Sequence, residues 1–229
     1  MMSTAGGKLR ELESKVGLGA LAVTLFGGLA TVALGSVSLD AIAQVATLRA
    51  PSEFSNIGDE RVRSQALFTE AGKVLLDPRC LNCHPKDRQP TQGNDMHPHM
   101  PPMHAATSGR GERGLACESC HQKTNTATNA KAIASVPGGG NPHWALPPAS
   151  MSWQGKTLSE ICEQLKDRKR NGNHDLEGIH HHVATDPLVA WAWNPGPGRR
   201  PALGSQKEFA DLIGAWVQTG GHCPVPTKN

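Results

Sequence analysis

One pentapeptide pattern occurs twice in this chain of 229 residues, and it constrains the fold more than any other feature. The first copy is CLNCH at residues 80–84, and the second is CESCH at residues 117–121. Each reads Cys-x-x-Cys-His, which is typical of covalent attachment of a c-type haem. Two thiols at this spacing reach two vinyl groups of one porphyrin, and the histidine that follows can bind the iron. The sequence therefore predicts two covalently attached c-type haems.

Haem attachment assigns a role to six residues of the two copies. The predicted thioether and proximal iron ligands are Cys80, Cys83, Cys117 and Cys120, and His84 and His121. A zinc ribbon is an alternative, because it also contains two Cys-x-x-Cys pairs, but about 15–20 residues usually separate them. Here 33 residues lie between Cys83 and Cys117. A thioredoxin-like redox pair is a second alternative, but it lies in a βαβ pattern that this sequence lacks.

An uncharged apolar segment lies near the N-terminus. Residues 16–39 contain no charged side chain over 24 positions, and about 20 apolar residues suffice for a helix to cross a bilayer. Basic residues precede it, which predicts a cytoplasmic segment 1–15, a transmembrane anchor (or uncleaved signal) at 16–46 and a periplasmic domain 47–229. The expected location is the bacterial inner membrane, with a single pass. The alternative is cleavage after Ala43 in an A-x-A pattern, which would leave a soluble periplasmic protein.

Two cysteines, Cys162 and Cys223, lie outside the repeated pentapeptides. Both interpretations of the N-terminus export the rest of the chain to an oxidising compartment, where an even leftover pair predicts a disulfide. The alternative is a pair of buried free thiols, which fits an exported protein less well.

The composition leaves little material for a conventional core. The chain has 25 Gly and 17 Pro residues, only four Phe and no Tyr. Haem macrocycles would supply the missing apolar surface, with Trp144, Trp153, Trp191 and Trp193 available to pack against them. The net charge of +3 is too balanced to indicate a protein that binds nucleic acid.

Hydrophobic periodicity predicts helices at residues 59–77, 157–170, 176–185 and 205–219, and no convincing strand. Thr157 followed by Glu160 is typical of a capping box at the start of the second helix. The segments between the helices are rich in Pro and Gly, which indicates long loops that wrap the haems. The predicted fold class is mainly α, a loop-rich dihaem cytochrome c domain with an N-terminal transmembrane helix.

Each iron has a sixth coordination position, and its occupant decides the chemistry. A second histidine or a methionine would make an electron carrier and set its potential, whereas an open position would permit small-molecule chemistry. The cluster at residues 97–104 has the better prospects, because it lies between the two pentapeptides. The full set of candidates is His97, His99, His104, His143, His174, His180, His181, His182, His222, Met96, Met100, Met103 and Met151.

Several segments resemble a family of bacterial exported dihaem cytochromes that is often labelled isoquinoline 1-oxidoreductase subunit. They are LNCHP at 81–85, HPH at 97–99, ICEQLKD at 161–167, DPLVAWAWNPG at 186–196 and Cys223-Pro224, within a similarity that covers about residues 60–225. The family pattern has histidines at the positions of His99 and His182, which implies that these are the distal ligands and that both haems are bis-His. His143 is the rival candidate. The loops are also similar to those of the small dihaem subunit of periplasmic nitrate reductase.

The resemblance implies an electron-transfer subunit rather than an enzyme. Its partners would be redox proteins of the periplasm or membrane, such as a molybdenum hydroxylase or a respiratory or photosynthetic complex. The alternative function is a haem enzyme, a peroxidase or small-molecule reductase, with one open axial site. A haem sensor on a membrane stalk is a third hypothesis, which the short cytoplasmic segment disfavours.

Overall fold

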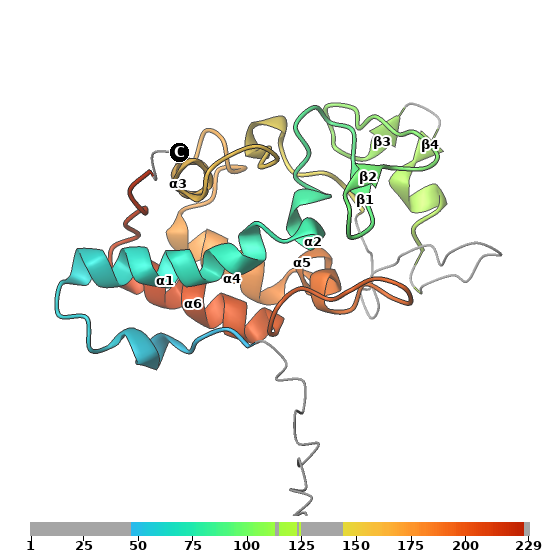
Figure 1. Ribbon diagram of the computed structural model, residues 1–229. Helices are drawn as coiled ribbons and strands as arrows, with labels where there is room; N and C mark the ends of the chain where they lie inside the picture. Colours follow the sequence, from blue (N-terminus) through green and yellow to red (C-terminus); the bar gives the residue numbers. More distant parts are fainter. Residues whose placement is uncertain (1–46, 113–114, 123, 125–143, 227–229) are drawn as a thin grey trace, which may run out of the picture. The chain divides into compact units, whose positions relative to one another are not determined.

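The structure is a computed structural model that describes residues 47–112, 115–122, 124 and 144–226 (Figure 1). The chain divides into two units, residues 1–42 and residues 43–229, and every described residue belongs to the second unit. The predicted cytoplasmic segment and anchor, residues 1–15 and 16–46, lie outside the described residues, as does the candidate ligand His143. Within the described part, no helix has the length and apolar character needed to cross a bilayer.

The longest helices of the described chain are α1 (Glu60–Leu75), α3 (Leu158–Lys166), α4 (Leu176–Thr185) and α6 (Gln206–Gln218). They coincide with the four predicted helices to within a few residues. Each begins after a residue whose side chain accepts a hydrogen bond from the backbone of the first turn, namely Asp59, Thr157, Asp175 and Ser205. Thr157 and Glu160 form the predicted capping box.

Helix α3 ends four residues earlier than the sequence predicts. The prediction extended it to Arg170, whereas the helix stops at Lys166. The Asp167 carboxylate accepts hydrogen bonds from the backbone N–H of Lys169 at 3.0 Å and from Nε of Arg170 at 2.8 Å. These local bonds offer the backbone an alternative to another helical turn.

Shorter elements carry most of the loop-rich part. The helical turns are Pro51–Phe54, α2 (Pro78–Leu81), Cys117–Ser119, Ala149–Met151, α5 (Pro187–Ala190) and Trp191–Trp193. The strands are β1 (Thr91–Gln92), β2 (His97–Pro98), β3 (Gly111–Glu112) and β4 (Leu115–Ala116), and they form the antiparallel pairs β1–β2 and β3–β4. The sequence predicted no strand because two residues are too few for a period-two pattern.

The main core lies between α1 and α6, which run side by side in Figure 1. Phe68 of α1 and Trp216 of α6 are fully buried, and their ring centroids lie 4.8 Å apart. Leu212 and Ile213 are also fully buried, and α4 packs against the same helix. Figure 1 shows the β1–β2 hairpin near α2, and side chains of Arg79 and Asn82 bond to Gly93 in the loop of this hairpin.

Cys162 of α3 and Cys223 form the disulfide that the sequence predicts, with Cα atoms 5.6 Å apart. Cys162 is fully buried in the core, while Cys223 follows the end of α6. The bond therefore ties α3 to the C-terminal end of the α1–α6 pair.

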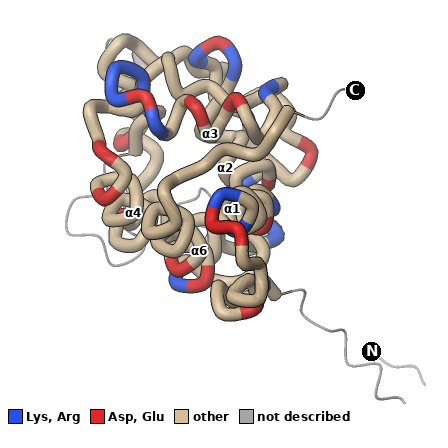
Figure 2. The backbone as a smooth tube through the Cα atoms, turned by 90° about the vertical axis from the view of Figure 1, so that its left-hand side faces the viewer, with Lys and Arg blue, Asp and Glu red and all other residues tan. Residues whose placement is uncertain are grey.

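Charged residues of both signs are interspersed on the side of the described chain that Figure 2 presents. Neighbouring residues on the helices form ion pairs, such as Lys207 with Asp211 at 2.7 Å and Lys73 with Glu70 at 2.6 Å. This mixed surface agrees with the balanced net charge of the sequence.

Candidate functional site

The first pentapeptide begins in helix α2. Asp77 caps this helix by accepting a hydrogen bond from the backbone N–H of Arg79 at 2.8 Å. The carbonyl oxygen of Cys80 then accepts hydrogen bonds from the backbone N–H groups of Cys83 and His84, both at 3.1 Å. One helical turn therefore spans the pentapeptide, and it places the two cysteines, three positions apart, on one side.

The second pentapeptide has the same backbone pattern. The carbonyl oxygen of Cys117 accepts hydrogen bonds from the N–H groups of Cys120 at 3.2 Å and of His121 at 2.9 Å. This turn follows strand β4, whereas the first turn follows helix α1, so the neighbouring structure differs. The two copies thus share a local backbone conformation although their flanking elements differ.

His84 is half-buried and oriented by two contacts. Its Nδ1 lies 2.7 Å from the carbonyl oxygen of Met151, and its ring stacks on Trp153 with centroids 3.4 Å apart and an angle of 8°. Burial is the main cause that lowers the pKa of His84 to about 4; the Met151 carbonyl opposes this shift and the charge of His182 adds to it. His84 is therefore neutral near pH 7, with Nε2 the nitrogen available for a metal, as in most histidine ligands.

A cavity of about 600 Å³ lies beside the second pentapeptide. Cys117, Cys120 and His121 line it, and so does Cys83 of the first pentapeptide. Burial is the main cause that raises the pKa of Cys83 to about 11, and the nearby thiol of Cys117 raises it further. Both pentapeptides therefore border one space, whose volume falls in the range of about 300–1,000 Å³ that is typical of ligand and cofactor sites.

His99 and His121 both line this cavity, and their rings lie near each other. Their ring centroids lie 6.0 Å apart, with an angle of 53° between the ring planes. Bonds from a metal to imidazole nitrogen are about 2 Å long, so two imidazoles on opposite sides of one metal have centroids about 6 Å apart. Nδ1 of His99 lies 2.8 Å from the carbonyl oxygen of Pro101, which leaves Nε2 for a metal. His121 stacks on Trp144 at 4.1 Å.

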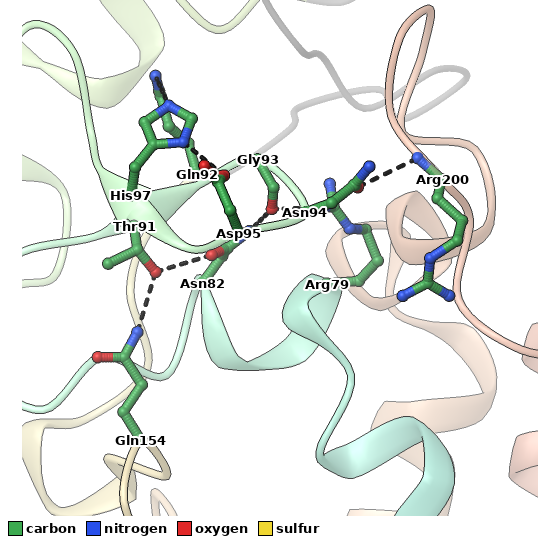
Figure 3. A network of polar contacts seen from close by, with 10 residues as sticks. All are labelled: Arg79, Asn82, Thr91, Gln92, Gly93, Asn94, Asp95, His97, Gln154 and Arg200. Atoms are coloured by element: carbon green, nitrogen blue, oxygen red, sulfur yellow. Dashed lines mark hydrogen bonds and ion pairs between the residues drawn. The ribbon is translucent and has the colours of Figure 1, made fainter.

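His97 also lines the cavity, but both of its ring nitrogens have partners. Nδ1 lies 2.6 Å from the Asp95 carboxylate, and Nε2 lies 3.1 Å from Nε2 of Gln92 (Figure 3). Of the two histidines in the HPH segment, the structure therefore leaves His99 as the one with a nitrogen available.

The tract of three histidines lies on α4, and its members have different neighbours. His180 packs against α6 at Gly214, and His181 contacts Thr185. His182 is exposed, with Nδ1 3.3 Å from the Asp186 carboxylate. His182 also lies near enough to His84 for its charge to act on that imidazole. The charge of His182 is thus one influence on His84 of the first pentapeptide, while His99 is in ring contact with His121 of the second.

Buried donors without a partner were missed by the sequence analysis. Among the described residues, no acceptor meets Nε or Nη1 of Arg79, or Nε1 of Trp144 and of Trp191, and all three side chains line the cavity. The sequence predicted that Trp144 and Trp191 could pack on a porphyrin. It predicted no role for Arg79, which lies just outside the first pentapeptide. Of the other tryptophans, Trp193 packs on Phe209 instead.

These donors test whether the site fits a haem. A porphyrin is an apolar plate with two anionic propionates. The cavity is lined by three cysteines, two neighbouring histidines and buried donors that have no acceptor among the described residues. The residues present therefore fit the predicted cofactor. Within the described ranges, no group of three or more His, Cys, Asp or Glu side chains is arranged to hold a bare metal ion.

Hydrogen bonds join the first pentapeptide to the β1–β2 hairpin (Figure 3). Nδ2 of Asn82 donates to the carbonyl oxygen of Gly93 at 2.9 Å, and its Oδ1 accepts from Oγ1 of Thr91 at 2.7 Å. Gln154 donates to the same Thr91 hydroxyl at 2.9 Å. His99 follows β2 and lines the cavity beside the second pentapeptide. The network therefore links Asn82, inside the first pentapeptide, to the hairpin that carries His99.

No protein-family model matches the chain, and neither a curated protein nor a solved structure matches it.

Proposed function

We propose that this protein is an electron-transfer protein that carries two covalently attached c-type haems. One observation carries the proposal: both Cys-x-x-Cys-His pentapeptides adopt the same helical turn, and His99 lies beside His121 of the second pentapeptide. Chance cysteine pairs would have no reason to share that turn and that arrangement.

The residues that would hold the first haem are Cys80, Cys83 and His84, with His182 at the sixth position. Those that would hold the second are Cys117, Cys120, His121 and His99. When bound, each haem supplies a one-electron Fe(III)/Fe(II) couple. The chain contributes orientation: the carbonyl oxygens of Met151 and Pro101 direct the imidazoles of His84 and His99.

Location and partners belong to the same proposal. The charge-free segment 16–39 supports an anchor in the bacterial inner membrane, and the Cys162–Cys223 disulfide is consistent with an oxidising compartment. The domain would then exchange electrons in the periplasm with a membrane complex or a redox enzyme such as a molybdenum hydroxylase. The family resemblance described above is the support for that choice of partner.

The decisive experiment is the mass of the protein produced with a cytochrome c assembly system. We expect two covalent haems, and one haem in each of the variants C80A/C83A and C117A/C120A. The variant C162A/C223A is the matched control, because it also loses two cysteines but should keep both haems. A protein without any covalent haem would refute the proposal.

The alternative, a haem enzyme with an open axial site, makes a different spectroscopic prediction. The carrier should be low-spin at both haems in both oxidation states and should not bind carbon monoxide rapidly. Rapid binding at one haem would favour the enzyme.

A further inference from the structure

We propose that Arg79 and Arg199, together with the indole N–H groups of Trp144 and Trp191, form the binding site for the propionates of the porphyrin at the second pentapeptide. This inference rests on the proposed function, and it assigns a role to residues outside the two pentapeptides. All four side chains line the 600 Å³ cavity that contains Cys117, Cys120 and His121.

Arg79 is the central residue of this site. It is only 2% exposed, and its Nη2 donates to the carbonyl oxygen of Gly93 and to Oδ1 of Asn94, as Figure 3 shows. Its Nε and Nη1 are buried without an acceptor among the described residues. A buried charged group with unused donors is costly, because it has lost water without a replacement. A carboxylate in the cavity would satisfy these donors.

The charges around Arg79 also favour an anionic ligand. The guanidinium groups of Arg199 and Arg200 act on Arg79 and, after burial, contribute to lowering its pKa, while the Asp77 carboxylate raises it. Asp77 already pairs with Arg200, with Oδ2 2.9 Å from Nη2. Two arginines, Arg79 and Arg199, therefore line a cavity whose other lining residues are mostly apolar or uncharged. Their positive charge suits a ligand with two negative charges.

The two tryptophans favour a flat ligand that carries hydrogen-bond acceptors. Nε1 of Trp144 and Nε1 of Trp191 are buried without an acceptor in the described part of the chain. The two rings meet edge to face with centroids 5.5 Å apart, and the Arg79 guanidinium lies 5.8 Å from the ring of Trp191. Indole N–H groups and a planar guanidinium together recognise carboxylate oxygens beside a flat apolar body. A porphyrin with its two propionates has that form.

The site would also affect the redox equilibrium of the second haem. Reduction removes one positive charge from the iron, so a fixed positive charge near it favours the reduced state. The guanidinium groups would also offset the propionates, whose negative charge favours the oxidised state. Loss of one arginine should therefore lower the reduction potential of the second haem.

The test compares four variants of the haem-loaded protein: R79Q, R199Q, R79K and R168Q. Haem count is measured by mass and the potentials by spectroelectrochemical titration. In R79Q and R199Q we expect two haems and a reduction constant for one haem lowered about tenfold, which corresponds to 59 mV for one electron. R79K should retain most of the potential, because it keeps the charge. R168Q should resemble the wild type, because Arg168 is exposed and donates to Asn173 instead.

Wild-type potentials in both R79Q and R199Q, with two haems present, would overturn the inference but leave the proposed function intact. Absence of haem from the wild-type protein would refute the proposed function itself. Because Arg79 also holds Gly93 and Asn94, R79Q could fail to fold; the result for R199Q then decides, since Arg199 lies in the loop before α6.

Discussion

The imidazole rings of His99 and His121 lie with their centroids 6.0 Å apart, and both line a cavity that two cysteines of the second pentapeptide also line. His121 belongs to the turn after β4, whereas His99 follows β2 in another hairpin. The two histidines therefore come from loops that follow different hairpins, and the sequence alone cannot predict that these loops lie close together.

Replacement of His99 by alanine should convert one haem of the two to the high-spin state, because the second iron would lose its sixth ligand. Both haems should stay covalently attached, since the cysteines are unchanged. Absorption and electron paramagnetic resonance spectra measure the spin states. The control is H97A, because His97 also lines the cavity but has both ring nitrogens occupied. A low-spin H99A protein would remove His99 from the ligand set and favour Met100 or Met103, which also line the cavity.

Replacement of His182 by alanine should affect the other haem. The family resemblance places a distal ligand at His182, so loss of this histidine should open the proposed first iron to carbon monoxide. The neighbouring variant H181A is the control, because His181 contacts Thr185 within the same helix. Combining H182A with H99A should give two high-spin haems; a double variant with one low-spin haem would contradict the assignment.

The Cys162–Cys223 disulfide should contribute strongly to stability. It closes a loop with a sequence separation of 61 residues, for which chain entropy predicts a contribution of about 4 kcal/mol. We expect C223A to lower the free energy of unfolding by roughly that amount in urea titrations. This variant keeps the buried sulfur of Cys162 and so separates the cross-link from core packing. An unchanged denaturation midpoint would show that the bond does not constrain the unfolded chain.

Gly109 should not tolerate a side chain. Its φ is +78°, and a Cβ there would lie 2.3 Å from the carbonyl oxygen of Leu146, a wall of the cavity. The left-handed backbone alone costs about 1–2 kcal/mol for alanine, and the collision adds to it. The control is G155A, because Gly155 also has a φ of +78° but nothing within 4 Å of a Cβ. Denaturation should show G109A to be clearly less stable than G155A; equal stabilities would contradict the close approach.

The sequence predicted the helical part of the fold well because its signals are local. Asp59, Thr157 and Ser205 stand immediately before amphipathic stretches, and each caps the expected helix. The disulfide was predicted from the even number of cysteines left outside the pentapeptides, together with the expectation that the chain is exported. By contrast, the end of α3 depends on side-chain bonds of Asp167 that periodicity does not register.

The site was only half predictable. Cysteine spacing identified both pentapeptides, because attachment chemistry is local. The contact of His99 with His121 depends on tertiary structure, as does the burial of Arg79. Nothing in the residue pattern distinguishes Arg79 from a surface arginine, since its buried state is created by Trp191 and the hairpin loop at Gly93.

Cys83 shares a wall of the cavity with Cys117, and this has a consequence for how the molecule would store electrons. If both pentapeptides carry a haem, as proposed, two iron centres that border one cavity would not titrate independently, because the charge gained by one would raise the energy of charging its neighbour. The protein would then take up its two electrons at two different potentials, even if both irons had identical ligands. A stepwise two-electron reservoir of this kind could accept a pair from one donor and release single electrons to another.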